Sequence, residues 1–502
     1  MNVNQIKLGA IISYLALFTN VIIGLVYTPW LIKTIGKSDY GLYTLAMSII
    51  GLVAFDFGLG NATTKFITQY LAEGRQDKVD NLLGLVYKLY LLVDVVIFII
   101  LFVVYLNLPS IYKGLTTDEL GRFSIVFAIA ATYCVLSFPF IPINGVLTSY
   151  EKFVQLKTCD LAYRLIIVFT MTGCLLLGFG LYALVLVNSA AGIINILAKL
   201  IVIKRATPLR VNLLFWSKSE LVTIFKFVLW VTIAALAQRL IFNISPSILG
   251  IFSDSQAIAI LGVAITLESY TFMFANALNG MFLPKVSRMV VNNTVDEILE
   301  LMTKIGRIQI YIIGYICIWL IAFGRHFISV WMGEQYLLVY PCGLLIILPS
   351  FFQLPQEIGL TYIIATNKVK LQAYINVLMG IVNVCLSIPL TLKWGVMGMC
   401  ISIFVAYMIR TICLDVVLKR VLNLNVLLFF KGSFLKLAPC LFISLLLSIS
   451  CNLIMEDRGW LDLLLKSFFS IVLYAAIVYY LGFNSFEKKT FIEPIKQLTT
   501  HH

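Results

Sequence analysis

Long apolar runs separated by short polar segments are the feature that most constrains this chain of 502 residues. Crossing ~30 Å of hydrocarbon takes about 20 helical residues, because each residue rises roughly 1.5 Å. Backbone polar groups in lipid need internal partners, so such runs are expected to be helical. The sequence therefore predicts an all-α integral membrane protein. About fourteen runs reach the required length, at residues 8–32, 41–64, 82–106, 123–147, 161–179, 182–203, 221–251, 257–283, 306–324, 338–364, 372–392, 395–416, 436–455 and 462–482.

Composition agrees with a lipid environment. Hydrophobic residues make up 61% of the chain and charged residues only 12%, so a water-soluble fold would expose too much apolar surface. The ten cysteines lie mostly within or beside the apolar runs and form no CxxC motif. They are expected to pack within helices, which excludes a disulfide scaffold or a zinc site.

The positive charges predict the orientation of the chain. Most of the 37 Lys and Arg residues fall in segments that face one side if the N-terminus is cytoplasmic, and cytoplasmic loops of membrane proteins are rich in these residues. The chain is therefore expected to have both termini inside (N-in/C-in). The same placement explains the net charge of +13 and excludes nucleic acid as a partner, because no basic arm or domain collects the charges.

One stretch of the sequence occurs twice, in weakened form the second time. Residues 27–81 hold an apolar run ending at Pro29, the turn KTIGKSDYGLY, a second run and the polar exit DFGLGNATTKFITQYLAEGRQDK. In the second half, Pro246 leads through IFSDSQA (residues 251–257) into another run that exits at Lys285 and Arg288. Duplicated blocks with an even number of helices share one orientation and are related by an axis along the membrane normal, as in some transporters.

The duplication gives a domain division. Two six-helix lobes in parallel pseudo-repeat are followed by two C-terminal helices. We expect an N-lobe at 1–203, a cytoplasmic inter-lobe loop at 204–220, a C-lobe at 221–416, a cytoplasmic loop at 417–435, helices thirteen and fourteen at 436–482, and a cytoplasmic tail at 483–502.

The first hairpin carries a family resemblance. With KSDYGLY in the first outer turn and DFGLGNATTKF leading to AEG at the second inner exit, the chain resembles the Wzx-type polysaccharide flippases of the multidrug/oligosaccharidyl-lipid/polysaccharide exporter (MOP) superfamily. The resemblance implies a multi-pass protein of the bacterial cytoplasmic (inner) membrane. Such a protein flips an isoprenoid-diphosphate-linked oligosaccharide by alternating access, for surface polysaccharide assembly. It further implies an undecaprenyl-diphosphate-type glycolipid as substrate, membrane lipid and polysaccharide assembly proteins as partners, and a monomer.

Arg239 is the residue first expected to meet such a substrate, because it is the one basic residue deep in a predicted span. A cation at that depth costs roughly 2.5–3.5 kcal/mol unless it faces water, a partner or the bundle interior. We therefore place it on a cavity wall, where it contacts the diphosphate or pairs with an acid such as Glu268 or Glu357. Asn243 shares its helical face better than Gln238 does, and both are substrate-site candidates.

Intramembrane acids can carry protons or Na⁺ in transporters. Glu268 and Glu357 have three alternative roles: ion coupling, pairing with Arg239, or lining the cavity. For Asp56 the alternatives are ion coupling and a structural role, in which it bonds to nearby backbone or to Lys65. Coupling to H⁺ or Na⁺ is the only cofactor-like requirement expected.

Pro29 and Pro246 occupy equivalent places near the outer ends of their helices. Proline removes a backbone donor, so both are candidate gate hinges, and the alternative is ordinary kinking without motion. The polar turns after them carry Lys37 and Asp39 in one copy and Asp254 in the other. These turns are expected to touch when an outer gate closes.

Catalytic motifs are missing from the sequence. It holds only three His residues and no GxSxG, HExxH or ATP-binding loop, so a transporter with no catalytic residues and no metal is expected. Two alternatives to the flippase stay open: a multidrug or small-molecule exporter of the same superfamily, and a polytopic glycan polymerase or acyltransferase.

Overall fold

The computed structural model describes residues 24–56, 59–279, 282, 286, 289–290, 295–366, 368–455, 459–484 and 487–488. Every regular element in these ranges is helical, which confirms the all-α prediction. By packing, the chain forms two compact units. Unit 1 holds the residues up to Gly262 together with Asn376–Ser402, and unit 2 holds Val263–Ile375 and Ile403 onward.

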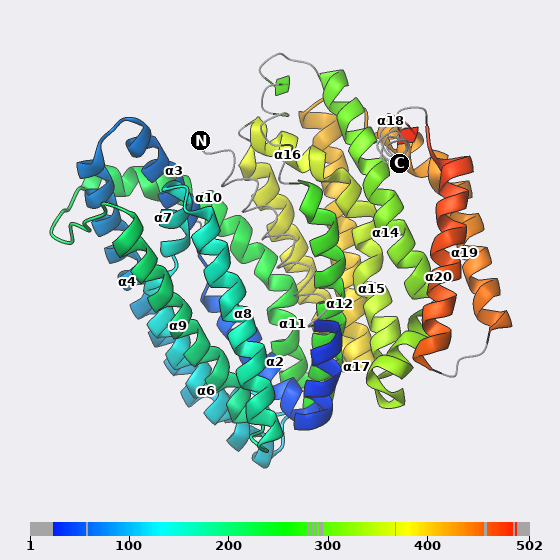
Figure 1. Ribbon diagram of the computed structural model, residues 1–502, viewed down its shortest axis with the longest axis horizontal. Coiled ribbons are helices and arrows are strands. Elements are labelled where there is room, and N and C mark those ends of the chain that lie inside the picture. The colour runs from blue at the N-terminus through cyan, green and yellow to red at the C-terminus, as the bar shows by residue number, and fades with distance from the viewer. Residues whose placement is uncertain are drawn as a thin grey trace, which may run out of the picture. The chain divides into compact units, whose positions relative to one another are not determined.

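Unit 1 begins with helical residues 24–35. In its main bundle α4, α6, α8 and α9 run alongside one another, with α2 packed on α6 (Figure 1). Its elements are α2 (Lys37–Val53), α3 (Leu59–Ala72), α4 (Gln76–Leu106), α5 (Leu108–Ile111), α6 (Thr117–Ser137), η1 (Phe138–Phe140), α7 (Ile143–Ser149), α8 (Phe153–Leu176), α9 (Leu181–Ala206), α10 (Lys218–Phe242), α11 (Ile244–Phe252), the start of α12 (Ser255–Asn279) and the middle of α17 (Val369–Val421).

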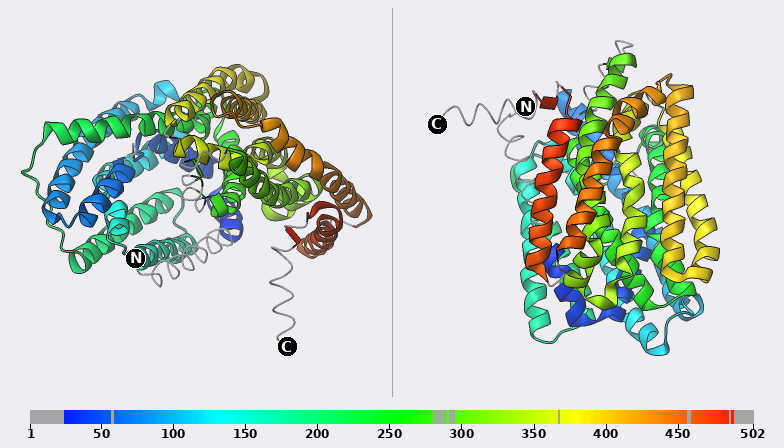
Figure 2. Two further views of the ribbon diagram at one scale, coloured as in Figure 1. Left: turned by 90° about the horizontal axis from the view of Figure 1, so that it is seen from above. Right: turned by 90° about the vertical axis from the view of Figure 1, so that its right-hand side faces the viewer.

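Unit 2 is built on the long helix α14, against which α15, α19 and α20 pack. Figure 2 (right) shows α19 and α20 side by side next to α14. Besides the rest of α12 and α17, its elements are α14 (Val295–Met332), η2 (Glu334–Tyr336), α15 (Val339–Gln353), η3 (Leu354–Gln356), α16 (Glu357–Ala365), α18 (Val426–Phe430), η4 (Lys431–Leu435), α19 (Lys436–Ile454), α20 (Trp460–Ile477) and η5 (Val478–Gly482).

Eleven helical stretches in the described residues are long and apolar enough to cross a membrane. Three differences separate this number from the fourteen predicted runs. The run at 8–32 begins before the described residues, the run at 41–64 is divided into the shorter α2 and α3, and two runs are joined in α17. The protein is thus a multi-pass membrane protein, while the exact number of spans and the N-in/C-in orientation stay predictions.

Helix breaks follow proline and glycine. Pro139 and Pro142 lie where α6 gives way to η1 and α7, because proline cannot donate the backbone bond that would continue the helix. Gly395 interrupts α17 with a φ of 55°, a left-handed conformation that glycine adopts without steric cost. It divides the predicted runs 372–392 and 395–416.

The two packing units do not coincide with the predicted lobes. Residues 221–262, assigned to the C-lobe by sequence, pack in unit 1, where α10 contacts α2 and α3 and α11 contacts α2. The middle of α17 joins them there. Packing units and mechanical lobes are different divisions of a chain, so the lobe boundaries stay a prediction.

Candidate functional site

Asp56 lies in the break that divides α2 from α3, not inside one continuous helix. Its two carboxylate oxygens accept from the backbone N–H of Gly60 at 2.9 and 3.1 Å, and one of them also accepts from the hydroxyl of Tyr90 on α4 at 2.5 Å. This is how an acid caps the N-terminus of a helix. A Cβ at position 60 would sit 2.9 Å from both oxygens, so glycine permits the close approach. These bonds support the structural alternative for Asp56; the side chain of Lys65 lies outside the description.

Arg239 meets the other side of the same break. Its Nη1 donates to the carbonyl of Gly51 at 2.8 Å, and its guanidinium lies 5.6 Å from the centre of the Phe55 ring. Gly51 is in the last turn of α2, where carbonyls lack helical partners and a cation is favourable. Arg239 is half-buried. Its contacts in unit 1 therefore stabilise the C-terminus of α2.

Asn243 packs on the same glycine as Arg239. A Cβ at Gly51 would come within 2.3 Å of Asn243 Nδ2 and 3.5 Å of Arg239 Nη1. Gln238 is exposed, on a different face of α10. The structure thus brings Arg239 and Asn243 together at the α2–α3 break and leaves Gln238 apart from them.

The predicted run 221–251 is not one helix, because α10 kinks at Leu240 and α11 begins after Asn243. The buried Asn383 on α17 donates from Nδ2 to the Leu240 carbonyl at 3.0 Å, and Ser402 Oγ donates to the carbonyl of Asn383 at 2.8 Å. The kink next to Arg239 is thus held from within unit 1. Asn383 was not singled out in the sequence, although a polar amide in the run 372–392 was the available signal.

The two prolines differ in their surroundings. Pro246 is buried in the first turn of α11, one turn after the kink, as expected for a ring that clashes with the carbonyl four residues earlier. Pro29 is buried within helical residues 24–35. A hinge function for either proline stays a prediction.

The polar turns after the two prolines lie against each other in unit 1. Ser38 and Ser255, 217 positions apart, are joined by a hydrogen bond of 3.0 Å. Asp39 pairs with Arg122 on α6, and burial raises the pKa of the Asp39 carboxyl above its usual range, although the Arg122 guanidinium opposes the shift.

The charged residues of the second turn support the same contact. Asp254 accepts from the backbone N–H of Ala257 at 2.7 Å, which caps α12. Its charge also attracts that of Lys37. Lys37, Asp39 and Asp254 are thus all at the contact between the turns.

Glu268 and Glu357 belong to unit 2. Glu268 is buried on α12, and Tyr407 lies near enough to interact with the charges of both Glu268 and Arg410. Glu357 begins α16, where Gln353 hydrogen-bonds to it and Arg410 is its neighbouring cation. In the described part of the chain, no three His, Cys, Asp or Glu side chains gather closely enough to hold a metal ion.

The expectation that Arg239 is the one deeply placed cation is wrong. Arg307 and Arg410 are 4% and 7% exposed. Arg307 Nε and Glu487 Oε1 are 2.6 Å apart in a buried ion pair. Sequence position understates burial at helix ends, because the tertiary packing that covers these residues comes from distant segments.

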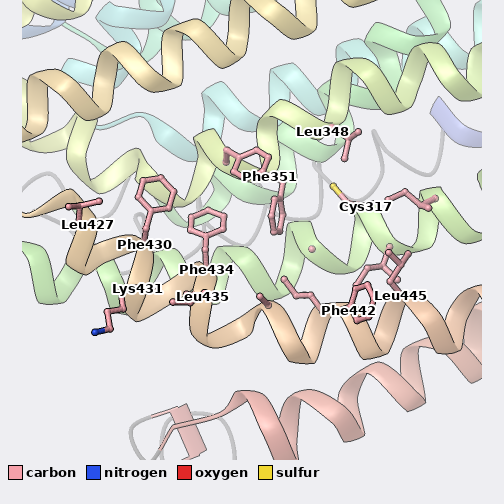
Figure 3. Close-up of a pocket in the computed structure, with 16 residues that line it drawn as sticks. Cys317, Leu348, Phe351, Leu427, Phe430, Lys431, Phe434, Leu435, Phe442 and Leu445 are labelled. Atoms are coloured by element: carbon pink, nitrogen blue, oxygen red, sulfur yellow. The ribbon is translucent and has the colours of Figure 1, made fainter.

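An apolar groove of about 770 Å³ lies in unit 2 between α14, α15 and the α18–η4–α19 segment (Figure 3). Phe351, Phe430 and Phe434 line one part of it, and Lys431 stands at its end with the amine directed away from the rings. The exposed Phe442 lies along the rest of the groove. The sequence predicted lipid-facing grooves for a prenyl chain but named no residues for them.

These features define the class of the protein: a multi-pass helical protein with broken helices and polar contacts inside the predicted membrane region. Its fold is similar to that of the lipid II flippase MurJ in an inward closed conformation, with a TM-score of 0.65 and 13% identity over 94% of this chain and 99% of that one. It is also similar to an inward-facing multidrug resistance MATE family transporter of the MOP superfamily, with a TM-score of 0.66 and 13% identity over 80% and 96%. The MATE transporter VcmN of Vibrio cholerae gives 0.57 and 13% over 84% and 97%.

Sequence comparison defines the family more narrowly. The sequence pattern described as polysaccharide biosynthesis protein matches residues 6–290, more than half of the chain. The chain belongs to this polysaccharide biosynthesis protein family. Among curated proteins, none matches it.

Proposed function

We propose that the protein is a flippase that carries an isoprenoid-diphosphate-linked oligosaccharide across the bacterial cytoplasmic membrane by alternating access. Family membership supports a role in polysaccharide biosynthesis, and the fold supports transport. The substrate would be an undecaprenyl-diphosphate-type glycolipid, and a monomer that contacts polysaccharide assembly proteins would carry it.

The observation that carries the proposal is the apolar groove. A prenyl tail in the membrane is already in an apolar solvent, so the groove gains little from the hydrophobic effect and must act by packing and orientation. It would keep the tail beside α19 while the polar head crosses between the leaflets. The adjacent Lys431 would attract the diphosphate, because a cation near the headgroup level favours an anionic group.

The C-terminal helices separate this proposal from the drug-exporter alternative. The groove depends on the α18–η4–α19 segment, which belongs to the two helices expected beyond the six-plus-six arrangement. The lipid II flippase aligns with 94% of this chain and the MATE transporter with 80%. A longer chain with an added apolar groove favours a lipid substrate.

Arg239 and Asn243 are proposed to contact the diphosphate or the first sugars. Because Arg239 also holds the end of α2 through Gly51, such contact would link the substrate to the α2–α3 break. Coupling to H⁺ or Na⁺ is proposed for Glu268 or Glu357, whose charges lie in the buried group with Tyr407 and Arg410.

A deletion strain tests the proposed function. Loss of the protein is expected to leave undecaprenyl-linked repeat units accumulated on the cytoplasmic side and to remove the surface glycan, and the wild-type chain should restore both. Unchanged surface glycan without accumulation would exclude the flippase. Altered drug resistance alone would favour the exporter.

A further inference from the structure

Glu119, in the first turn of α6, connects the equivalent turns of the two repeats. Ser38 Oγ donates to Glu119 Oε1 at 2.6 Å, and Ser255 Oγ lies 2.5 Å from the same oxygen. One carboxylate oxygen thus accepts from both serines, which occupy matching positions of the duplicated stretch. No sequence motif singles out Glu119, because its partners lie 81 and 136 positions away.

The second oxygen of Glu119 has a different task. Oε2 accepts from the backbone N–H of Thr116 at 2.9 Å, and Thr116 Oγ1 accepts from the Glu119 N–H at 3.3 Å. This reciprocal pair is a capping box that stabilises the start of α6. The two oxygens separate the two roles, so each can be removed without the other.

The backbone around this contact has no spare room. A Cβ at Gly41 would lie 2.0 Å from the Ser255 carbonyl oxygen, and a Cβ at Gly114 would lie 1.9 Å from that of Ser253. Real Cβ atoms cannot approach an oxygen so closely. The turn before α12 is therefore seated between α2 and the segment that precedes α6, with glycine on both sides.

We propose that Glu119 is the residue that holds this end of unit 1 closed, and that the Ser38–Glu119–Ser255 contact opens in each transport cycle. The proposal rests on the alternating access of the proposed function. A contact between matching positions of the two repeats is suited to a reversible closure. It consists of neutral hydroxyls on one carboxylate, and water can replace each bond at a small net cost.

A cross-link tests whether the contact must open. In the double variant Ser38→Cys/Ser255→Cys, the side chains are close enough for a disulfide, since their hydroxyls are already in contact. Oxidation is expected to cross-link the protein and abolish flipping of a prenyl-diphosphate oligosaccharide in proteoliposomes, and reduction should restore it. The wild type, which has its own ten cysteines, and each single variant are oxidised in parallel. Full activity of completely cross-linked protein, or a folded double variant that does not cross-link, would overturn the proposal.

Hydrogen–deuterium exchange tests Glu119 itself without any substrate. Glu119→Ala is expected to speed exchange in peptides covering residues 37–43 and 251–257 more than Thr116→Ala does, because only the former loses the serine contacts. Glu119→Gln, whose amide oxygen can still accept from the serines, should stay near wild type. Asp118→Ala is the matched control, because Asp118 pairs with Arg122 and does not contact the serines.

Equal exchange in Glu119→Ala and Thr116→Ala would reduce Glu119 to a helix cap and overturn the proposal. The exchange result does not depend on the flippase activity. If the wild type flips no prenyl-diphosphate oligosaccharide, the proposed function fails, while exchange still decides whether Glu119 holds the contact.

Discussion

Arg239 combines a structural contact with a proposed substrate contact, and its single hydrogen bond to Gly51 is where the two meet. Spacing alone placed Arg239 and Asn243 on one face of a helix, and the structure has them there on one glycine. Spacing could not indicate that the face packs on the end of α2, because that contact spans 188 positions.

Arg239→Ala is predicted to lower the free energy of unfolding by about 1–2 kcal/mol, because the Gly51 carbonyl loses a charged donor, and to reduce flipping. Thermal unfolding in detergent and flipping in proteoliposomes measure the two effects. Gln238→Ala, one position earlier on an exposed face, should change neither. Wild-type flipping by Arg239→Ala at a normal membrane level would remove Arg239 from the substrate site.

Gly41→Ala is predicted to destabilise the protein by about 1–3 kcal/mol, as overpacking does, because the new Cβ would meet the Ser255 carbonyl at 2.0 Å. Thermal unfolding checks the sign. Gly121→Ala in α6 is the control, since a Cβ there meets nothing within 4 Å, and alanine favours a helix over glycine by roughly 0.5–1 kcal/mol. Equal loss in both variants would mean that the close approach at Gly41 is not tight.

At the scale of helices, the structure divides two predicted spans and holds the pieces with side chains from other helices. The breaks at Pro139, Pro142 and Gly395 could be predicted, because proline and glycine act through their own backbone. The breaks at Asp56 and Leu240 could not, because they depend on Tyr90 and Asn383, which are distant in the chain.

Asn383→Ala is predicted to cost about 1–3 kcal/mol of unfolding free energy, the penalty for a buried polar group left without its partner, here the Leu240 carbonyl. Ser387→Ala on the same helix is the control. Ser387 is equally buried, but its hydroxyl bonds only to the carbonyl of Val384, three residues earlier. Melting temperatures of the two variants decide the matter, and a Ser387→Ala loss as large as that of Asn383→Ala would contradict the assigned role.

The groove gives a prediction about one element of unit 2. Ala438→Trp is expected to slow flipping of a long-chain substrate more than of a short-chain analogue, because Ala438 lines the groove on α19 and a large ring would occupy the space of the tail. Leu446→Trp is the matched control, since Leu446 is exposed on the same helix but does not line the groove. Equal rates for the two variants would exclude the groove as the site of the tail.

At the scale of the whole molecule, the helical class and the membrane environment could be predicted from the length and composition of the apolar runs. The family followed from the first hairpin, within the matched residues 6–290. The groove, the buried Arg410 and the role of Glu119 could not be predicted, because each is created by packing between segments far apart in sequence. Rotation of a helix about its axis decides such contacts, and an apolar run that is hydrophobic all round does not specify it.

The most direct test of the account is flipping by the purified protein in proteoliposomes. A fluorescent prenyl-diphosphate oligosaccharide is placed in both leaflets, and a membrane-impermeant reductant destroys the dye on the outer side. With the wild-type chain we predict that the inner pool also becomes accessible, and that Ala438→Trp delays this loss while Leu446→Trp does not. An inner pool that stays protected, as in protein-free vesicles, would contradict the assignment of this protein as a lipid-linked oligosaccharide flippase.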